Sequence, residues 1–303
     1  MTYDVVIVGA GIAGLTAAIY LRRAGKTVLV LESRTYGGQI ITTKSIENYP
    51  ATMGISGMEF SKRIYDQAVG FGTEVKFENV MAVSDGKVKQ VKTNQTTYTT
   101  KTIIIATGSK NRTMGLNHEQ NFIGKGISYC ATCDGAFFKD KIVAVVGGGN
   151  TALQDAIYLA DLAQKVYIIL RRATFNGEAT LVDQVRAKPN VTVIPNAQVV
   201  ELLGDNKLKG IKIVENAQRE RQIDLDGLFV AVGRVPENEK FANLVDLDAN
   251  GYIIAGEDCE TGTAGVYVAG DCRTKEVRQL VTAASDGCVA AMHAIKYLNH
   301  DQA

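Results

Sequence analysis

The feature that most constrains the fold of this chain is a glycine-rich turn that occurs twice. The first copy, at residues 9–14, reads GAGIAG. It follows a short apolar, largely β-branched run over 3–8 and precedes a helical pattern that ends at Gly25; a buried strand is expected next, over 27–31. Glycines at this spacing allow a tight turn, a close backbone approach and close packing of helix on strand, which predicts a βαβ unit. These glycines are Gly9, Gly11 and Gly14.

The second copy predicts another βαβ unit. An apolar strand is expected over 141–146, then the turn GGGNTA at 147–152, a helix over 152–163 and a strand over 165–170. The residues of this turn that match the first are Gly147, Gly149, Asn150, Thr151 and Ala152. Two such units place the chain in the α/β class, with two Rossmann-like dinucleotide-binding domains.

The two units differ at the end of their second strand. Glu32 lies 23 residues after the first glycine of its turn, where a carboxylate accepts hydrogen bonds from ribose hydroxyl groups. The equivalent residue of the second unit is Leu170, which is followed by Arg171 and Arg172. Arginine pairs with a phosphate that a carboxylate would repel, so the second unit is predicted to take a dinucleotide with a ribose 2′-phosphate. The alternative is that both arginines form a solvated strand end.

Two nucleotide units in one chain imply a flavin in the first and a nicotinamide in the second. Two later buried strands, over 102–106 and 265–269, support the flavin unit. A carboxylate after the second of these strands suits the ribityl chain or the pyrophosphate region of a flavin. The residues that follow these strands are Thr107, Gly108, Gly270 and Asp271.

This order of strands predicts that the first domain is discontinuous. We expect it to comprise residues 1–112 and 240–303, with the second domain, 113–239, inserted into it. The segments 115–120 and 234–239 are polar and rich in turn-forming residues, which suits linkers.

Composition and charge exclude several other classes of protein. With 303 residues, of which 46% are hydrophobic and 21% charged, the chain is typical of globular proteins with two domains. A net charge of +1 provides no basic field for nucleic acid. No apolar run approaches the roughly 18 residues of a membrane span. Because an apolar strand starts almost at the first residue, no signal peptide and a cytoplasmic location are expected.

A pair of cysteines, Cys130 and Cys133, lies in the sequence CATCDG just before the second turn. Five cysteines are too few, and an odd number, for a secreted disulfide scaffold. A closed zinc site needs four ligands, and the sequence has no second CxxC and no CxxH, so no metal is expected. A redox dithiol is predicted instead, because exchange needs an attacking thiolate and a neighbouring sulfur that resolves the mixed disulfide.

Over essentially its whole length the chain resembles the low-molecular-weight thioredoxin reductases. The motifs that carry the resemblance are GxGxxG, Gly37-Gly38-Gln39, Glu47-Asn48-Tyr49-Pro50, Ala106-Thr107-Gly108, CATCDG, GxGxxA, Gly270-Asp271 and Arg278-Gln279-Leu280 with Thr282-Ala283-Ala284. The resemblance implies a homodimeric flavoenzyme that binds FAD, takes hydride from NADPH and reduces the disulfide of thioredoxin or a thioredoxin-like protein. It also implies that the nicotinamide domain rotates against the flavin domain, with hinges at 113–119 and 234–240.

The resemblance also implies roles for single residues. Cys133 would be the sulfur nearer the flavin, Cys130 the sulfur that attacks thioredoxin, and Asp134 the proton donor and acceptor. The alternative for Asp134 is a turn or helix-capping residue. The further FAD-binding residues that the resemblance implies are Gly38, Gln39, Asn48, Arg278, Gln279 and Leu280.

The chain departs from the family's NADPH signature, His-Arg-Arg-x-x-x-Arg. Leu170 stands at its first position and Asn176 at its last, so two of four phosphate-contacting groups are missing. A hydrogen bond to a charged group contributes roughly 1.5–3 kcal/mol, and about 1.4 kcal/mol is tenfold in affinity. Their loss is expected to weaken NADPH binding by about two orders of magnitude or more, unless a neighbour compensates.

Three functions follow from these observations. The first is an NADPH-dependent thioredoxin reductase. The second keeps the flavin and the dithiol but takes electrons from NADH or ferredoxin, or runs in reverse as a flavin-dependent dithiol oxidase. The third is a non-catalytic flavin-binding redox sensor, which the intact CATCD motif and donor-binding turn disfavour.

Overall fold

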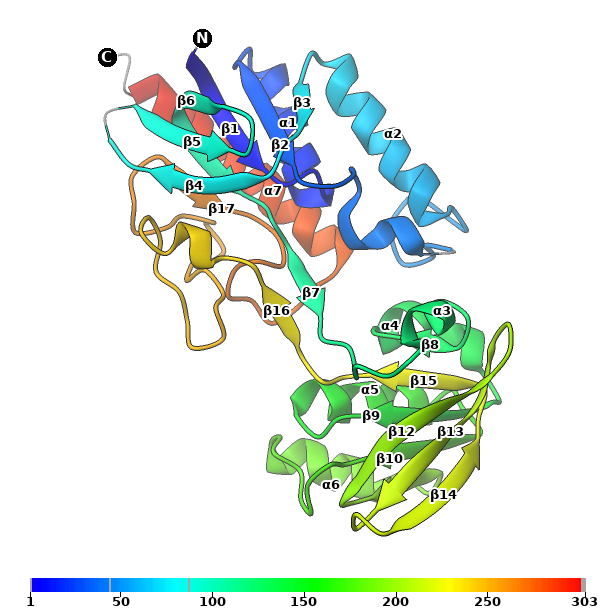
Figure 1. Ribbon diagram of the computed structural model, residues 1–303. Coiled ribbons are helices and arrows are strands. Elements are labelled where there is room, and N and C mark those ends of the chain that lie inside the picture. Colours follow the sequence, from blue (N-terminus) through cyan, green and yellow to red (C-terminus); the bar gives the residue numbers. More distant parts are fainter. Residues whose placement is uncertain (1, 44, 87, 301–303) are drawn as a thin grey trace. The chain divides into compact units, whose positions relative to one another are not determined.

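The computed structural model of the protein describes residues 2–43, 45–86 and 88–300. The chain forms two compact units: unit 1 comprises Met1–Lys110 with Val235–Ala303, and unit 2 comprises Asn111–Arg234. The chain passes between the units twice, once in each of two paired strands (Figure 1). These strands are β7 (Ser109–Asn111) and β16 (Arg234–Pro236).

Unit 1 is built on a seven-stranded sheet with the order β3-β2-β1-β6-β5-β4, in which β17 pairs with the end of β6. Its strands are β1 (Thr2–Val8), β2 (Val28–Glu32), β3 (Glu74–Phe77), β4 (Val80–Ser84), β5 (Lys89–Thr93), β6 (Thr97–Ile105) and β17 (Val266–Val268). Strands β1, β2, β3, β6 and β17 are parallel, whereas β4 and β5 extend the sheet in antiparallel pairs. Parallel strands that are covered on both faces have continuous apolar sequences, which is why these strands could be predicted.

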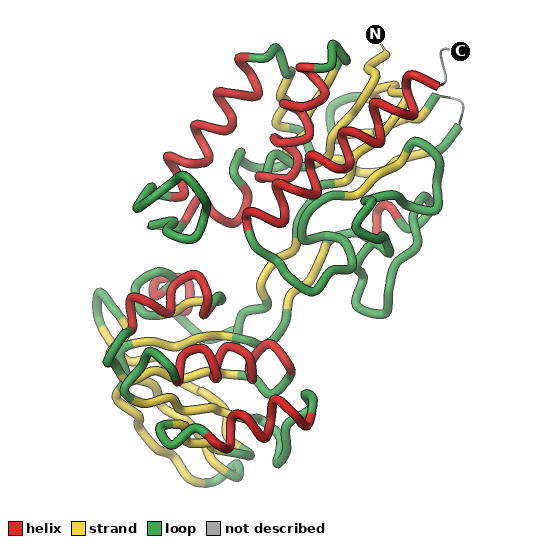
Figure 2. Tube along the Cα trace, turned by 180° about the vertical axis from the view of Figure 1, so that it is seen from behind, coloured by secondary structure: helices red, strands yellow, loops and turns green. Residues whose placement is uncertain are grey.

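Both faces of this sheet are covered. On one face Val5 and Ile7 pack with helices α1 and α7, and on the other Val6 and Val8 pack with the segment that contains Phe241. Figure 2 shows α7 as the long helix that ends beside the C-terminus. The helical elements of this unit are α1 (Ile12–Arg23), α2 (Gly57–Gly70), α7 (Leu280–His300), η1 (Gly38–Thr42) and η3 (Glu239–Phe241).

Unit 2 combines a five-stranded parallel sheet, of order β11-β10-β9-β15-β8, with the antiparallel sheet β12-β13-β14. The parallel strands are β8 (Ile127–Ser128), β9 (Ile142–Val146), β10 (Lys165–Ile169), β11 (Val191–Ile194) and β15 (Gly227–Val230). The antiparallel strands are β12 (Ala197–Gly204), β13 (Leu208–Glu215) and β14 (Arg219–Asp224). The helical elements are α3 (Glu119–Phe122), α4 (Ala131–Asp134), η2 (Gly135–Phe138), α5 (Asn150–Ala160) and α6 (Ala179–Ala187).

The predicted α/β class with two Rossmann-like units is confirmed. The bounds of some elements differ from the prediction. Helix α5 begins at Asn150, because Gly149 is its N-cap, and it ends at Ala160. Strand β6 begins at Thr97, earlier than predicted, because its first residues form an antiparallel hairpin with β5. In β5 buried and exposed residues alternate, so this part of the sheet lacks the continuous apolar run of the parallel strands. Among the described residues, no helix is long and apolar enough to cross a membrane.

Candidate dinucleotide and dithiol sites

The residues predicted to bind FAD gather at the carboxyl edge of the parallel strands of unit 1. Gly9 follows β1, Glu32 ends β2, Thr107-Gly108 follow β6, and Gly270-Asp271 follow β17. Because these four strands are neighbours in one sheet, segments far apart in the sequence meet at one edge. In open α/β sheets this edge is where ligands bind.

The first glycine turn has the shape that a dinucleotide requires. A Cβ added to Gly9, whose φ is +113°, would lie 2.3 Å from the Ala106 carbonyl oxygen, and a Cβ on Gly14 would lie 2.0 Å from the Gly9 oxygen. At Gly11 an added Cβ would meet no atom within 4 Å. The turn therefore packs tightly against the sheet but leaves space at Gly11, beside the start of α1, where unpaired helical N–H groups favour an anion. This arrangement fits a pyrophosphate.

Glu32 is tied to the same turn. Its carboxylate accepts hydrogen bonds from the backbone N–H groups of Ala10 and Arg34, both at 3.0 Å. A carboxylate has about four lone-pair sites, so these bonds orient it and leave acceptors for ribose hydroxyl groups. Gly38 also lies against the turn, since an added Cβ there would be 3.5 Å from the Cα of Gly11.

Three further loops bring the remaining candidates to this unit. The Gln39 side chain, in η1, donates to the Ser109 carbonyl. The Asn48 side chain donates to Gln279 Oε1 at 3.3 Å, which joins its loop to the segment before α7. The guanidinium of Arg278 lies over the Tyr252 ring, 4.4 Å from its centroid, and Leu280 begins α7.

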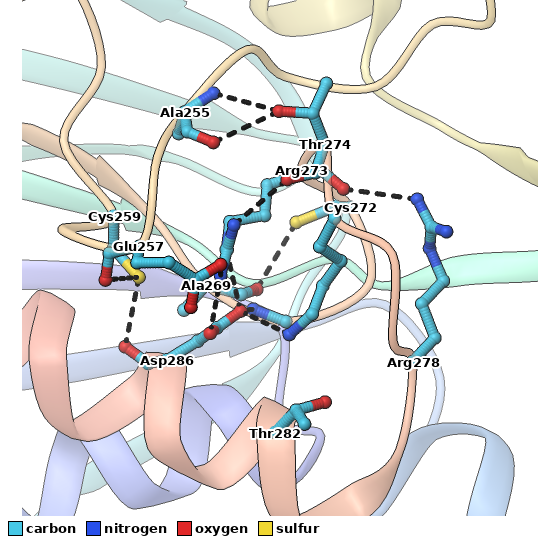
Figure 3. Close-up of polar contacts among 12 residues, drawn as sticks. Ala255, Glu257, Cys259, Ala269, Cys272, Arg273, Thr274, Arg278, Thr282 and Asp286 are labelled. Carbon is cyan, nitrogen blue, oxygen red and sulfur yellow. Dashed lines mark hydrogen bonds and ion pairs between the residues drawn. The ribbon is translucent and has the colours of Figure 1, made fainter.

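A buried ionic cluster joins Arg273, which lies two residues after Asp271 in the sequence, to Asp286 (Figure 3). Asp286, on α7, accepts hydrogen bonds from the Gly270 backbone N–H, from Arg273 and from Lys275, each at 2.9 Å. The side chains of Arg273 and Asp286 are 1% and 5% exposed. Burial raises the pKa of Asp286, but its cationic donors outweigh that effect and hold the pKa below its ordinary value. Sequence patterns missed this cluster, and its one signal was an acidic residue in the apolar first half of a helix.

In unit 2 the second turn has the same construction. A Cβ added to Gly147, whose φ is +145°, would lie 2.3 Å from the Ala231 carbonyl oxygen, whereas one on Gly149 would meet nothing closer than 3.9 Å. The Asn150 side chain exchanges two hydrogen bonds with Glu178, at 2.7 and 2.8 Å. The predicted residues at the start of α5 are Asn150, Thr151 and Ala152, of which the last is fully buried.

The residues after β10 lie around this turn. Leu170 is buried, and its Cδ2 would lie 2.5 Å from a Cβ on Gly148, so it packs beneath the turn. Arg171 and Arg172 follow it and are both exposed. The Asn176 Oδ1 would lie 3.4 Å from the same Gly148 Cβ, which places the Asn176 amide beside the turn.

Cys130 and Cys133 form a disulfide at the start of α4. Cys130 is half-buried and Cys133 is exposed. Ser128 donates to the carboxylate of Asp134 at 2.6 Å and accepts the Cys130 backbone N–H at 3.1 Å. Ser128 therefore holds the Asp134 carboxylate and the backbone of the dithiol together, which suits a group that moves a proton during exchange.

The segment that precedes the dithiol is anchored by a buried carboxylate. Glu119 accepts the backbone N–H groups of Met114, Gly115 and Leu116 and the hydroxyl of Tyr129. Burial, reinforced by this bond to Glu119, raises the pKa of the Tyr129 hydroxyl. The segment 115–120, expected as a linker, thus belongs to the packed part of unit 2.

A dinucleotide-binding fold in each unit, together with a disulfide in one of them, defines the class of nucleotide-dependent disulfide oxidoreductases. The family model described as pyridine nucleotide-disulphide oxidoreductase matches residues 3–287. The chain is therefore an oxidoreductase of this class.

The chain is also similar to individual thioredoxin reductases over nearly its whole length. It is 42% identical to the thioredoxin reductase of Mycoplasma genitalium, over 96% of this chain and 93% of the relative. It is 39% identical to that of Bacillus subtilis, over 99% and 96%. The crystal structure of thioredoxin reductase from Streptococcus pyogenes matches with a TM-score of 0.94 and 36% identity, over 99% of each chain. The chain belongs to the thioredoxin reductases of the pyridine nucleotide-disulphide oxidoreductase family, which confirms the resemblance of its motifs.

Asp286→Asn is expected to lower the free energy of unfolding by roughly 3–5 kcal/mol, because it leaves buried Arg273 and Lys275 without their carboxylate. The loss is measured by urea unfolding at neutral pH. The stabilisation is complete above the unfolded pKa, about 3.9, and disappears as the pH falls through the lower folded pKa. The stabilities of the wild type and Asp286→Asn should therefore converge in acid.

Glu257→Gln is the control, since Glu257 also contacts Arg273 but is 91% exposed, and should cost less than about 1 kcal/mol. Equal losses for both variants would contradict the analysis.

Proposed function

We propose that this protein reduces the disulfide of thioredoxin or a thioredoxin-like protein, with NADPH as electron donor and FAD as the intermediate carrier. The observation that carries the proposal is the Cys130–Cys133 disulfide, which lies in the unit that also holds the second glycine turn. Its relatives of about 40% identity, named thioredoxin reductases, support the same conclusion.

FAD is assigned to the predicted domain of residues 1–112 and 240–303, which largely coincides with unit 1, and NADPH to the predicted domain of residues 113–239, which largely coincides with unit 2. Space beside Gly11 and Gly149, with close packing at Gly9 and Gly147, supports a pyrophosphate at each turn. The residues assigned to FAD are Gly9, Gly11, Gly14, Glu32, Gly38, Gln39, Asn48, Thr107, Gly108, Gly270, Asp271, Arg278, Gln279 and Leu280. Those assigned to NADPH are Gly147, Gly149, Asn150, Thr151, Ala152, Arg171 and Arg172. Bound at these residues, FAD would supply two-electron transfer between a reduced nicotinamide and a disulfide.

The dithiol performs the exchange. The Cys130 thiolate attacks a thioredoxin sulfur, a mixed disulfide forms and one thioredoxin thiolate leaves; Cys133 then attacks Cys130, which restores the disulfide and releases the second thiolate. Asp134, held by Ser128, gives and takes the proton that accompanies these steps. A sulfur that serves as nucleophile must reach solvent, and the dithiol occupies a partly exposed turn.

The electron donor depends on the segment after β10. The two exposed arginines there supply guanidinium groups for a 2′-phosphate, which supports NADPH. Leu170 is buried and Asn176 is uncharged, so neither adds a cation. This observation favours NADH as the second candidate, and ferredoxin as the donor remains an outcome of the test. A cytoplasmic homodimer is also proposed, on the family resemblance alone.

An anaerobic titration of the purified yellow protein with NADPH, NADH and reduced ferredoxin identifies the donor. Rapid loss of the visible flavin absorbance with NADPH is expected, with a slower or weaker response to NADH. Bleaching by ferredoxin alone would refute the proposed donor. Bleaching by NADPH with no transfer to thioredoxin would refute the proposed acceptor.

Cys130→Ser and Cys133→Ser are each expected to abolish thioredoxin reduction, because exchange needs both an attacking and a resolving sulfur. Bleaching of the flavin by the donor should persist in both variants. Thioredoxin turnover is followed with insulin or a chromogenic disulfide as the final acceptor. Cys288→Ser, on α7 and outside the disulfide, is the control and should retain activity; full activity in either dithiol variant would disprove the assignment.

Asn176→Arg is expected to tighten NADPH binding by about tenfold or more, since it restores one charge-assisted hydrogen bond. Binding of NADH, which lacks the phosphate, should change much less. Dissociation constants from fluorescence or calorimetry test this difference. Gln164→Arg adds the same charge at an exposed position of unit 2 away from the turn, and unchanged NADPH affinity is expected there. Equal effects of both arginines would show that residue 176 does not face the phosphate.

A further inference from the structure

A fully buried amide lies behind the edge of unit 1 to which FAD is assigned. Asn238 follows β16, and its side-chain nitrogen donates to the backbone carbonyls of Gly251 and Cys272, both at 2.9 Å. Its oxygen accepts the hydroxyl of Thr107 at 3.3 Å. A carbonyl oxygen can only accept, so the amide nitrogen must face both carbonyl groups, which leaves the amide oxygen for the hydroxyl. The sequence motifs and the mechanism proposed above leave Asn238 without a role.

This amide spans the point where two neighbouring strands separate. Strands β6 and β17 pair in parallel up to Ile105 and Val268. Beyond this pair begin two loops that are assigned to FAD. One contains Thr107, and the other contains Cys272, which directly follows Asp271. A single side chain therefore joins the two loops just beyond the end of the strand pairing.

The remaining bond of the amide reaches the segment that supports Arg278. The Gly251 carbonyl accepts this bond. The next residue, Tyr252, has the guanidinium of Arg278 over its ring, 4.4 Å from the centroid, and Arg278 also donates to the Arg273 carbonyl at 3.4 Å. Three segments that lie far apart in the sequence, each with or beside a residue assigned to FAD, therefore converge on Asn238.

The loop after β17 is held on both sides of Asp271. Before it, the Gly270 backbone N–H donates to Asp286 at 2.9 Å, and after it the Cys272 carbonyl accepts from Asn238. The φ of Gly270 is +82°, and glycine has the greatest conformational freedom of any residue. The two hydrogen bonds remove that freedom, and they fix the path of the backbone that carries the Asp271 carboxylate.

We propose that Asn238 is a positioning residue of the flavin site, which sets Thr107 and Asp271 in the relative places that FAD requires. The inference rests on the proposed function, because it takes FAD to bind at this edge of unit 1. Loops that are fixed before the ligand arrives lose less conformational freedom on binding, which strengthens the affinity. Removal of the amide leaves two buried carbonyl groups without their donor, so the loops should shift and FAD should bind more weakly.

The test is the affinity of the full-length protein for FAD. Protein loaded with FAD is diluted in steps, and the fluorescence of the released FAD gives the dissociation constant. Asn238→Ala is expected to weaken FAD binding by about tenfold or more. Asn243→Ala is the matched control, because Asn243 also donates from its amide to a backbone carbonyl of unit 1, that of Val83 at 2.8 Å, and FAD affinity should not change there.

Asn238→Asp separates the hydrogen bonds from packing, because the two side chains have nearly the same shape. The introduced carboxylate turns an acceptor toward both carbonyl groups, so FAD affinity at neutral pH should fall at least as far as in Asn238→Ala. A protonated carboxyl has one O–H donor, and the surrounding carbonyl oxygens and burial both raise its pKa. As the pH falls, one hydrogen bond returns, and the FAD affinity of this variant relative to the wild type should recover.

Thr107→Val is a milder variant, which removes the hydroxyl that reaches Asn238 and keeps the shape of the side chain. It should weaken FAD binding severalfold in the wild-type background. In the Asn238→Ala background it should have little further effect, because both substitutions remove the same hydrogen bond.

Equal FAD affinity of the wild type and Asn238→Ala would overturn the inference, even if urea unfolding showed a loss of stability, because Asn238 would then serve only as support. Fully additive effects of the Thr107 and Asn238 variants would also overturn it, as would an equal loss in Asn243→Ala. The measurement uses no electron donor and no thioredoxin. Absence of FAD binding in the wild type would refute the proposed cofactor itself, so this failure is distinct from failure of the inference alone.

Discussion

One close backbone approach, made twice, underlies the organisation of this protein. In each unit a glycine follows the first strand of the βαβ motif and lies against the carbonyl after the neighbouring parallel strand: Gly9 against Ala106, and Gly147 against Ala231. A Cβ at either glycine would lie 2.3 Å from that oxygen, a distance that no side chain can occupy. Because the turn stays close to the sheet, the next helix starts at the carboxyl edge of the strands. The dinucleotide contacts proposed for the two glycine turns depend on that edge.

The two units share this turn geometry but differ in the charge of the side chains beside the turn. Unit 1 places the Glu32 carboxylate beside its turn, hydrogen-bonded to Ala10. Unit 2 instead buries Leu170 under its turn and exposes two arginines immediately after it. We propose that the same geometry serves two dinucleotides, and that the residue at the end of the second strand distinguishes them.

Two carboxylates, Asp286 and Asp155, show how neighbours rather than burial alone determine charge. Asp286 has Arg273 and Lys275 within hydrogen-bond distance, so its pKa lies below the ordinary value. Burial instead raises the pKa of Asp155, on α5, to about 7, and the Ala131 backbone N–H only partly opposes that shift. The Asp286 carboxylate, charged over the physiological range, is suited to hold in place the segment that is proposed to bind FAD.

The sequence by itself determined what is encoded in contiguous residues. The strand–glycine–helix patterns and CATCDG are local signals, so the α/β class, both turns and the cysteine pair were predicted, with Glu32 and the two arginines placed by their spacing from a glycine. Only the tertiary structure decided the contacts between distant segments: Asp286 with Arg273, Ser128 with Asp134, and Asp155 with Ala131. Leu170 illustrates what the sequence alone cannot give. Its identity showed that a cation is missing at this position, whereas its burial under Gly148 is known only from the tertiary structure. Local patterns report backbone conformation, but the environment of a charge depends on which distant residues the fold brings beside it.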